Sequence, residues 1–232
     1  MDNDYIELKN WLEETRDISL ESMDGFFSER ADTYEVHMSQ WKRHYEWLSE
    51  LLPKDTSTLL DLGCGTGLEL DRIFRRFPSV EVTGVDLSEK MLDLLRKKHP
   101  DKNLHLVLAD YFLYEPKRES FDAAITFQTL HHFKAEKKRE IFKKIYSALK
   151  PGGVYIECDY IAVCEKIEKL TAAECERRRK RDGIPPEEFV HFDTPLTLEH
   201  ELEAIRSAGF KYVECLGFLK GDNHTAMIKG EK

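Results

Sequence analysis

Thr58-Leu-Leu-Asp-Leu-Gly-Cys-Gly-Thr-Gly-Leu68 is the stretch of the sequence that decides the fold. Its apolar first half predicts a buried strand, and the alternating glycines Gly63, Gly65 and Gly67 predict a sharp turn into a helix. Glycine suits such a turn because the backbone must bend tightly and let a ligand approach closely. The free N–H groups at the start of the helix can bind polar or anionic atoms. The stretch therefore predicts a strand, turn and helix that hold a ligand.

Two acidic residues stand at informative distances from this turn. Asp61 lies two positions before the first glycine, and Asp86 ends the next apolar run, nineteen residues past the last glycine. A carboxylate at that spacing suits bidentate hydrogen bonding to the two hydroxyls of a ribose. Alternating glycines alone would be weak evidence, but together with the two acids they indicate a ligand that contains a nucleoside.

Three motifs carry a family resemblance. Asp61–Gly67 resembles motif I of the class I S-adenosylmethionine-dependent methyltransferases, Gly84–Met91 resembles their second motif, and Leu149–Gly153 resembles the turn before their strand five. The likeness runs from about residue 55 to residue 163. It implies a doubly wound, Rossmann-like α/β fold with a seven-stranded, mostly parallel sheet, an antiparallel last strand and helices on both faces. It also implies S-adenosylmethionine as cofactor and S-adenosylhomocysteine as product.

The resemblance assigns the cofactor contacts residue by residue. Asp61 would approach the ammonium of the cofactor, Asp86 would bind the ribose hydroxyls, and Asp110 would accept from the adenine amino group. The expected cofactor-binding residues are Tyr34, Asp61, Gly63, Cys64, Gly65, Gly67, Asp86, Leu87, Met91, Asp110, Tyr111, Phe127 and Gln128. For Tyr34 a second interpretation stays open, in which the ring only packs its segment onto the core.

Strand and helix patterns alternate from residue 58 onward, which predicts a parallel sheet with ligands beyond the carboxyl ends of its strands. The expected strands span 58–63, 80–85, 104–109, 121–127 and 153–158, and the expected helices span 67–77, 89–98 and 135–149. A helix capped by Thr197 and two closing strands at 211–219 and 223–229 follow, with one closing strand inserted beside strand five.

We expect one domain over residues 1–232, with an N-terminal helical cap at 1–52 and a cap insertion at 160–196. The cap would include helices at 4–17 and 38–52, and a charged helix ending near Arg181. In relatives such caps commonly set the choice of substrate. Aromatic residues would line it and suit an apolar or flat acceptor, namely Phe26, Phe27, Trp41, Tyr160, Phe189 and Phe192.

The expected catalytic residues are His132, Asp159 and Tyr160. Methyl transfer needs in-line placement of a nucleophile, and a base is required only if that nucleophile carries a proton. The run Leu130–Phe133 resembles a family segment whose second histidine often lies near the donor. A backbone hydrogen bond at a helix start is an equally open interpretation for His132, and His131 is expected to be exposed.

Composition narrows the classes of partner. The formal net charge of −9 argues against general binding to nucleic acid or to an anionic membrane. The sequence contains no run of 18 apolar residues, and its acidic start does not resemble a signal peptide. The five cysteines lack metal-like spacing and favour reduced thiols. We therefore expect a cytoplasmic enzyme without a metal, acting on a small molecule as a monomer or homodimer.

Three alternatives stay open. An NAD-linked dehydrogenase would need its third glycine where Leu68 stands. The intact cofactor motifs weigh against a catalytically silent, cofactor-binding partner subunit, which measurable methyl transfer would exclude. The third alternative is an RNA or protein methyltransferase. The basic run Arg177–Arg181 would suit RNA, but acidic residues flank this run as on an ordinary solvated helix. The segment Phe127–Leu130 also lacks the Asn/Asp-Pro-Pro-Tyr/Phe pattern of enzymes that methylate amino groups of bases and glutamine.

Overall fold

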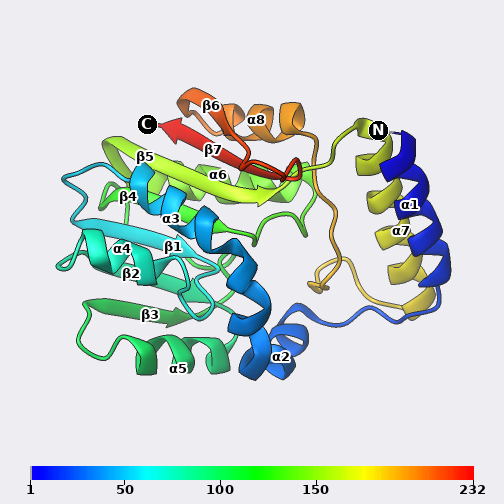
Figure 1. Ribbon diagram of the computed structural model, residues 1–232, viewed down its shortest axis with the longest axis horizontal. Coiled ribbons are helices and arrows are strands. Elements are labelled where there is room, and N and C mark those ends of the chain that lie inside the picture. Colours follow the sequence, from blue (N-terminus) through cyan, green and yellow to red (C-terminus); the bar gives the residue numbers. More distant parts are fainter. Residues whose placement is uncertain (1) are drawn as a thin grey trace.

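The computed structural model describes residues 2–232, and its centre is a seven-stranded sheet (Figure 1). The strand order is β3-β2-β1-β4-β5-β7-β6, in which β1 to β5 are parallel and β7 runs antiparallel to both of its neighbours. The strands are β1 (Thr58–Leu62), β2 (Glu81–Asp86), β3 (Leu104–Leu108), β4 (Phe121–Phe127), β5 (Leu149–Tyr160), β6 (Lys211–Gly217) and β7 (Thr225–Glu231). The predicted sheet is confirmed, including the closing strand inserted beside β5.

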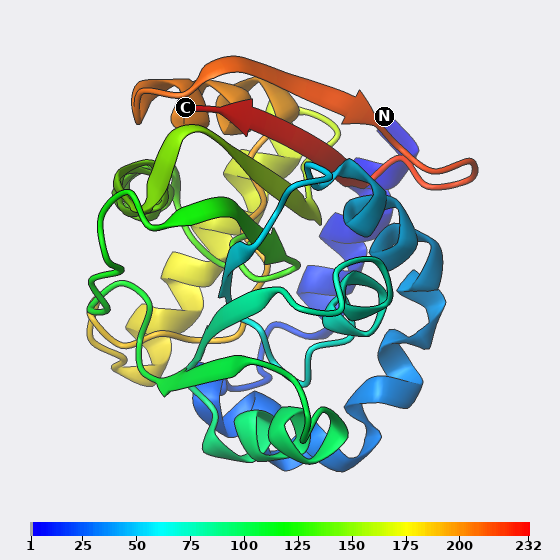
Figure 2. The same ribbon diagram turned by 90° about the vertical axis from the view of Figure 1, so that its left-hand side faces the viewer.

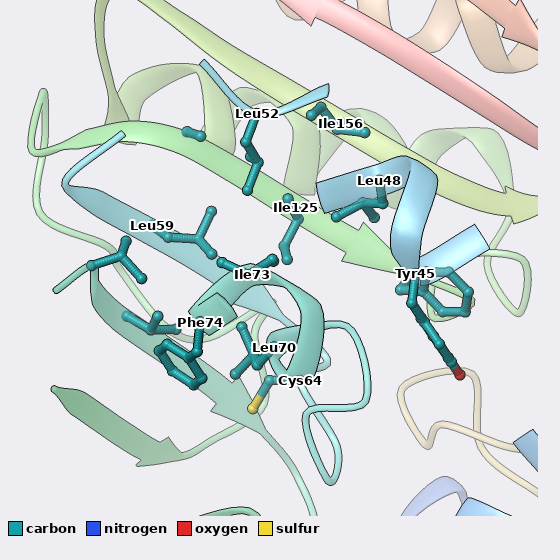
Figure 3. Close-up of a cluster of buried hydrophobic side chains, with 14 of the residues drawn as sticks. Tyr45, Leu48, Leu52, Leu59, Cys64, Leu70, Ile73, Phe74, Ile125 and Ile156 are labelled. Atoms are coloured by element: carbon teal, nitrogen blue, oxygen red, sulfur yellow. The ribbon is translucent and has the colours of Figure 1, made fainter. Parts of the chain in front are cut away.

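Helices cover both faces of the sheet. The face formed with α3 (Lys42–Leu51), α4 (Leu70–Arg76) and α5 (Glu89–Lys98) buries one apolar cluster, part of which Figure 3 shows around Leu59 and Ile125. The opposite face buries a second cluster with α6 (Ala135–Ala148) and α8 (Leu198–Ser207). Successive residues of β1 enter different clusters, as Leu59 and Leu60 do. The sequence of β1 is mostly apolar because both faces of this strand are buried.

The remaining helices lie beyond the carboxyl ends of the strands. Helices α1 (Asp2–Glu14) and α7 (Glu165–Asp182) lie side by side there (Figure 1). Helix α2 (Met23–Met38) leads through a short 3₁₀ helix, Ser39–Trp41, into α3, so the helix expected at 38–52 begins later than predicted. Viewed along the sheet in Figure 2, the two terminal strands β6 and β7 close one edge. Within residues 2–232 every helix is too short or too polar to span a lipid bilayer.

Strand β5 differs from its expected range of 153–158. It begins at Leu149, which pairs with Phe121, and a register shift opposite Phe121 and Ala123 absorbs the residues before Val154. Its pairing with β4 stops at Cys158, as predicted, but β7 continues to pair with it through Tyr160. Asp159 and Tyr160 therefore extend past β4 while still held in a strand.

The helix ends follow the local chemistry of the sequence. The hydroxyl of Thr197 accepts from the backbone N–H of His200, as expected of an N-cap, and Ser88 caps α5 in the same way. Helix α7 ends at Gly183, which takes a left-handed φ of 67°. These caps fix where α5, α7 and α8 begin or end around the carboxyl edge of the sheet.

Candidate functional site

The glycine turn between β1 and α4 is held close to the end of β2. The N–H of Gly65 donates to Asp86 Oδ2 at 2.8 Å, and the N–H of Gly63 donates to the carbonyl of Val85 at 2.8 Å. Gly63, Gly65 and Gly67 have φ of 75°, 48° and 67°, which disfavour a side chain. A Cβ at Gly63 would also collide with the side chain of Thr129, whereas Gly65 faces open space. The turn thus forms a backbone cradle with its open side at Gly65.

A narrow cavity of about 50 Å³ runs along the ends of β1, β2 and β3. Predicted residues that line it are Gly63, Asp86, Leu87, Asp110 and Tyr111. Each carboxylate oxygen of Asp86 accepts one backbone N–H, Oδ2 from Gly65 and Oδ1 from Ser88, so both oxygens keep a lone pair for another donor. The sheet topology brings these residues together as the sequence predicts.

A buried pair of acids lies beneath the cradle. Asp61 and Glu69 are 1% and 6% exposed, and one oxygen of each, Asp61 Oδ2 and Glu69 Oε1, has no hydrogen-bond partner among residues 2–232. Burial raises the pKa of both groups, that of Glu69 to about 7, and the neighbouring Glu69 charge raises the pKa of Asp61 further. Sequence reasoning missed Glu69, although an acid two residues after the last glycine could have signalled it.

A second cavity of about 740 Å³ opens beside the first, between α2 and the ends of β4 and β5. Tyr34, Gln128, His132 and Tyr160 line it. Gln128 adopts a left-handed φ of 47°, and its buried Nε2 finds no acceptor in the described part of the chain. Burial raises the pKa of Tyr34, and the nearby charges of Glu69 and Asp86 add to this rise. Tyr34 thus lines this cavity, and its ring also packs against Phe27 and the apolar core.

The expectation that His131 is exposed is wrong, since the side chain is 4% exposed. Its Nδ1 lies 2.5 Å from Asp159 Oδ1, and its Nε2 lies 3.4 Å from Asp193 Oδ1. Burial alone would lower the pKa of His131, but the two carboxylates outweigh it and raise this pKa to about 10. For His132 the balance is reversed, because burial and the charge of His131 lower its pKa.

His131, His132 and Asp193 form a group that we call the histidine cluster, and Asp159 holds His131 in place within it. The Asp159 side chain is 2% exposed, and its oxygens accept from the backbone N–H groups of Leu130, His131 and Tyr160 at 2.8 to 3.1 Å. With His131 Nδ1 as a further partner, the carboxylate is fully engaged. Asp159 thus fixes the loop after β4 rather than pointing into a cavity.

Three predicted cofactor residues lie behind the cavity walls. Cys64, Met91 and Phe127 are 2%, 1% and 7% exposed, and none of the described cavities has them in its lining. The N–H of Met91 donates the capping hydrogen bond to Ser88 Oγ, and Cys64 N donates to the Val85 carbonyl. These residues fix the positions of the backbone that faces the cavity.

The N-terminal segment and the insertion are joined to each other. Met23 N donates to the carbonyl of Phe189, and His191 N donates to the carbonyl of Glu21, each at 3.0 Å. Leu12 of α1 packs in one apolar cluster with Cys175 of α7 and with residues of the loop that follows it. From here on, the cap means residues 2–41 and 160–196, which leaves out part of the expected range 1–52 because residues 42–51 form α3 and pack on the sheet.

A cavity of about 670 Å³ lies between the cap and the ends of β5 and β7. Its walls include Trp41, Ile161, Ile167 and Phe192. Tyr160, His191 and Asp193 line both this cavity and the one of about 740 Å³. The two spaces therefore meet at the histidine cluster. Phe189, expected in the same lining, instead faces the narrow cavity.

The basic run of α7 is bound within the cap. Arg177 donates to the carbonyl of Arg16, and Arg181 donates to the carbonyl of Ile18, each at 2.8 Å. Arg179 donates to the carbonyls of Pro185 and Glu188 at 2.6 Å. These contacts tie the linker after α1 and the loop after α7 to the helix, and they favour a structural role for the run over RNA binding.

The chain is similar to a protein-family model and to curated proteins from other organisms. The family model described as a methyltransferase domain matches residues 59–153. An uncharacterized methyltransferase-like protein of Schizosaccharomyces pombe is 38% identical over 178 residues, which are 74% of this chain and 64% of the yeast protein. Carboxy-S-adenosyl-L-methionine synthase of Campylobacter fetus is 30% identical over 182 residues, covering 73% of this chain and 77% of the relative.

Solved structures share the fold. A phosphoethanolamine N-methyltransferase of Haemonchus contortus, crystallised with S-adenosylhomocysteine, aligns with a TM-score of 0.66 at 18% identity. The alignment covers 91% of this chain and 60% of the nematode protein. The chain thus spans about three fifths of the length of this protein and of the yeast relative.

Proposed function

Because the chain belongs to the class I S-adenosylmethionine-dependent methyltransferases, we propose that it transfers the methyl group to a small-molecule acceptor held beneath the cap. The observation that carries this proposal is the cavity of about 670 Å³, which meets the cofactor side of the molecule at Tyr160, His191 and Asp193. A cavity of this size and position suits a ligand of drug-like dimensions.

The residues present fit the cofactor. Asp86 would bind the ribose hydroxyls and Asp110 the adenine amino group, while Leu87 and Tyr111 would flank the base. The unpartnered oxygens of Asp61 and Glu69 suit the ammonium of the cofactor. When bound, the cofactor supplies a methyl group on a positively charged sulfur.

The apolar character of the cap cavity favours an apolar acceptor. Trp41, Phe192 and Ile167 supply aromatic and aliphatic walls. Tyr160, His191 and Asp193 supply polar groups where this cavity meets the one of about 740 Å³. An acceptor would place its reacting atom at that junction. A lone pair of the acceptor then forms the bond to the methyl carbon as the carbon–sulfur bond breaks, and the electrons of that bond stay on sulfur.

We assign the three catalytic candidates different parts. Tyr160 lines both large cavities and would contact the acceptor. His132, whose pKa is lowered by burial and by the charge of His131, is neutral at pH 7 and would take a proton from an acceptor that must lose one. Asp159 would act through His131 as a positioning residue, because its oxygens are fully engaged.

Calorimetric titration tests the proposal. We expect purified protein to bind S-adenosylmethionine and S-adenosylhomocysteine and not NAD. A mass-spectrometric screen of apolar hydroxylated, amino and carboxylic compounds should then yield a product heavier by one methyl group. Binding of neither cofactor form by a folded protein would overturn the proposal. Consumption of the methyl donor without any methylated acceptor would instead indicate a different reaction of the donor.

We expect Trp41→Ala to raise the KM for the acceptor about 10-fold, because the ring covers part of the cap cavity and aromatic burial contributes on the order of 1–2 kcal/mol. The dissociation constant for S-adenosylhomocysteine should change less than twofold. Trp47→Phe, a change at a ring that packs on the apolar core, is the matched control. Equal acceptor kinetics in Trp41→Ala and wild type would place the acceptor elsewhere.

The acid pair predicts how cofactor affinity depends on pH. Burial raises the pKa of Glu69 to about 7, so ionising this group costs stability in the free protein as the pH rises toward 7. A bound ammonium would favour the ionised form, so affinity for S-adenosylhomocysteine should rise between about pH 5.5 and pH 7, by up to about 10-fold. Glu69→Gln should flatten this dependence in calorimetric titrations. An unchanged slope in the variant would contradict the assignment of Glu69.

A further inference from the structure

The histidine cluster has the composition of a metal site. His131 Nε2, His132 Nδ1 and Asp193 Oδ1 all lie within 4.8 Å of one another. Asp193 Oδ1 is 3.4 Å from the first nitrogen and 3.2 Å from the second. Ligand atoms about 2.0–2.1 Å from a tetrahedral zinc ion are separated by about 3.3 Å, so both nitrogen–oxygen distances match those around a shared cation.

The surroundings of His131 are those of a metal ligand. Its Nδ1 is held by the carboxylate of Asp159, which leaves Nε2 directed at Asp193. A carboxylate on the far nitrogen fixes the tautomer and the ring orientation of metal-binding histidines. Thr194 N donates to the carbonyl of His131 at 2.8 Å, which holds the loop that carries Asp193 against the loop after β4.

His132 supplies an independent observation. The residue is 9% exposed, and its Nδ1 makes no hydrogen bond with any described residue although Asp193 is nearby. A buried polar atom without a partner is costly, and coordination of a cation would satisfy it. The Asp193 side chain is 52% exposed and lines both large cavities, so the cluster is open to solvent and to an acceptor.

We propose that His131, His132 and Asp193 bind a divalent first-row transition metal whose remaining coordination positions face the junction of the two large cavities. Two imidazoles and one carboxylate suit zinc, iron or nickel better than magnesium or calcium. The cation would bind a hydroxyl or carboxylate oxygen of the acceptor and hold it beside the methyl-donor site. This role rests on the proposed function, and it would make His132 Nδ1 a ligand instead of a proton acceptor.

The test is calorimetric titration of the untagged, chelator-treated chain with ZnCl₂, followed by S-adenosylhomocysteine in the same samples. We expect one zinc site per chain in the wild type. Loss of a group that only holds a metal ligand in place typically weakens metal binding by about 10- to 100-fold. Asp193→Asn and His132→Gln each remove a ligand, so each should weaken zinc binding by at least that factor. His200→Gln is the matched control, because His200 also pairs with a carboxylate, Glu168, but on the surface.

The outcomes separate the two proposals. Asp193→Asn and His200→Gln should bind S-adenosylhomocysteine as the wild type does, which shows that they are folded and that the cofactor site is intact. Circular dichroism shows whether His132→Gln is folded, because His132 also lines the narrow cavity. Wild-type protein that binds S-adenosylhomocysteine and no zinc overturns the metal site and leaves the proposed function standing. Equal zinc binding by the wild type, Asp193→Asn and His132→Gln also overturns it, because the ion would then be bound elsewhere. In the Co²⁺-loaded wild type, a visible absorption band that Asp193→Asn lacks would support coordination by this carboxylate.

Discussion

Asp86→Ala is expected to weaken binding of S-adenosylhomocysteine by about 100-fold or more. Hydrogen bonds to a charged group contribute about 1.5–3 kcal/mol each, two are expected to the ribose hydroxyls, and each ~1.4 kcal/mol changes affinity about tenfold. The carboxylate also accepts from Gly65 N at 2.8 Å, so the variant is expected to loosen the glycine turn as well. Calorimetric titration of both proteins measures the ratio of the dissociation constants.

Two further variants make the result for Asp86 interpretable. Asp93→Ala removes a carboxylate from the same part of the molecule, on α5, where its side chain is 52% exposed and pairs with Arg96. It should bind S-adenosylhomocysteine like the wild type. Asp86→Asn keeps one oxygen acceptor without the charge and should fall between wild type and Asp86→Ala. If Asp86→Ala is folded by circular dichroism and binds as tightly as Asp93→Ala, Asp86 does not hold the ribose.

The sheet, and the meeting of the predicted acids at one edge of it, were predictable because their signals are local in the sequence. Each of β1, β2 and β3 is a short, mostly apolar run with an acid near its carboxyl end: Asp61 is the last residue but one of β1, Asp86 ends β2, and Asp110 lies two residues past β3. Parallel strands bring their carboxyl ends to one edge. The spacing of the glycines also indicates where the backbone turns. Positions of this kind depend on neighbours within a few residues, so pattern and spacing are sufficient.

The histidine cluster was not predictable in the same way. The burial of His131 depends on Asp159 of β5 and Asp193 of the loop after α7, and neither lies near it in the sequence. Likewise, the basic run of α7 acquires its role only from the carbonyls of Arg16 and Ile18, which a different segment supplies. Such contacts arise from tertiary packing, for which the sequence has no periodic signal.

A buried ionic cluster lies between α6, α8 and β5, close behind the catalytic candidates. Lys138 Nζ is 2.5 Å from Glu201 Oε2, and the two side chains are 0% and 1% exposed. Glu157 is also 0% exposed, and neither of its oxygens has a hydrogen-bond partner within residues 2–232. Burial raises the pKa of Glu157 well above its usual range, and the charge of Glu201 adds to this rise. Burial also raises the pKa of Glu201, while the Lys138 cation beside it lowers this pKa, so Lys138 and Glu201 form the ion pair of the cluster.

Lys138→Met is expected to lower the free energy of unfolding by about 3–5 kcal/mol, because it leaves the Glu201 carboxylate buried without a counter-charge. Urea denaturation followed by circular dichroism measures the loss. Lys137→Met is the matched control, because Lys137 is the next residue along α6 but is 47% exposed and pairs with Glu140 on the surface. Its free energy of unfolding should stay within about 0.5 kcal/mol of the wild type. The double variant Lys138→Met/Glu201→Leu should recover much of the stability, because it removes both charges together. A double variant no more stable than Lys138→Met would show that the loss comes from packing around the lysine stem, and not from the unpaired charge.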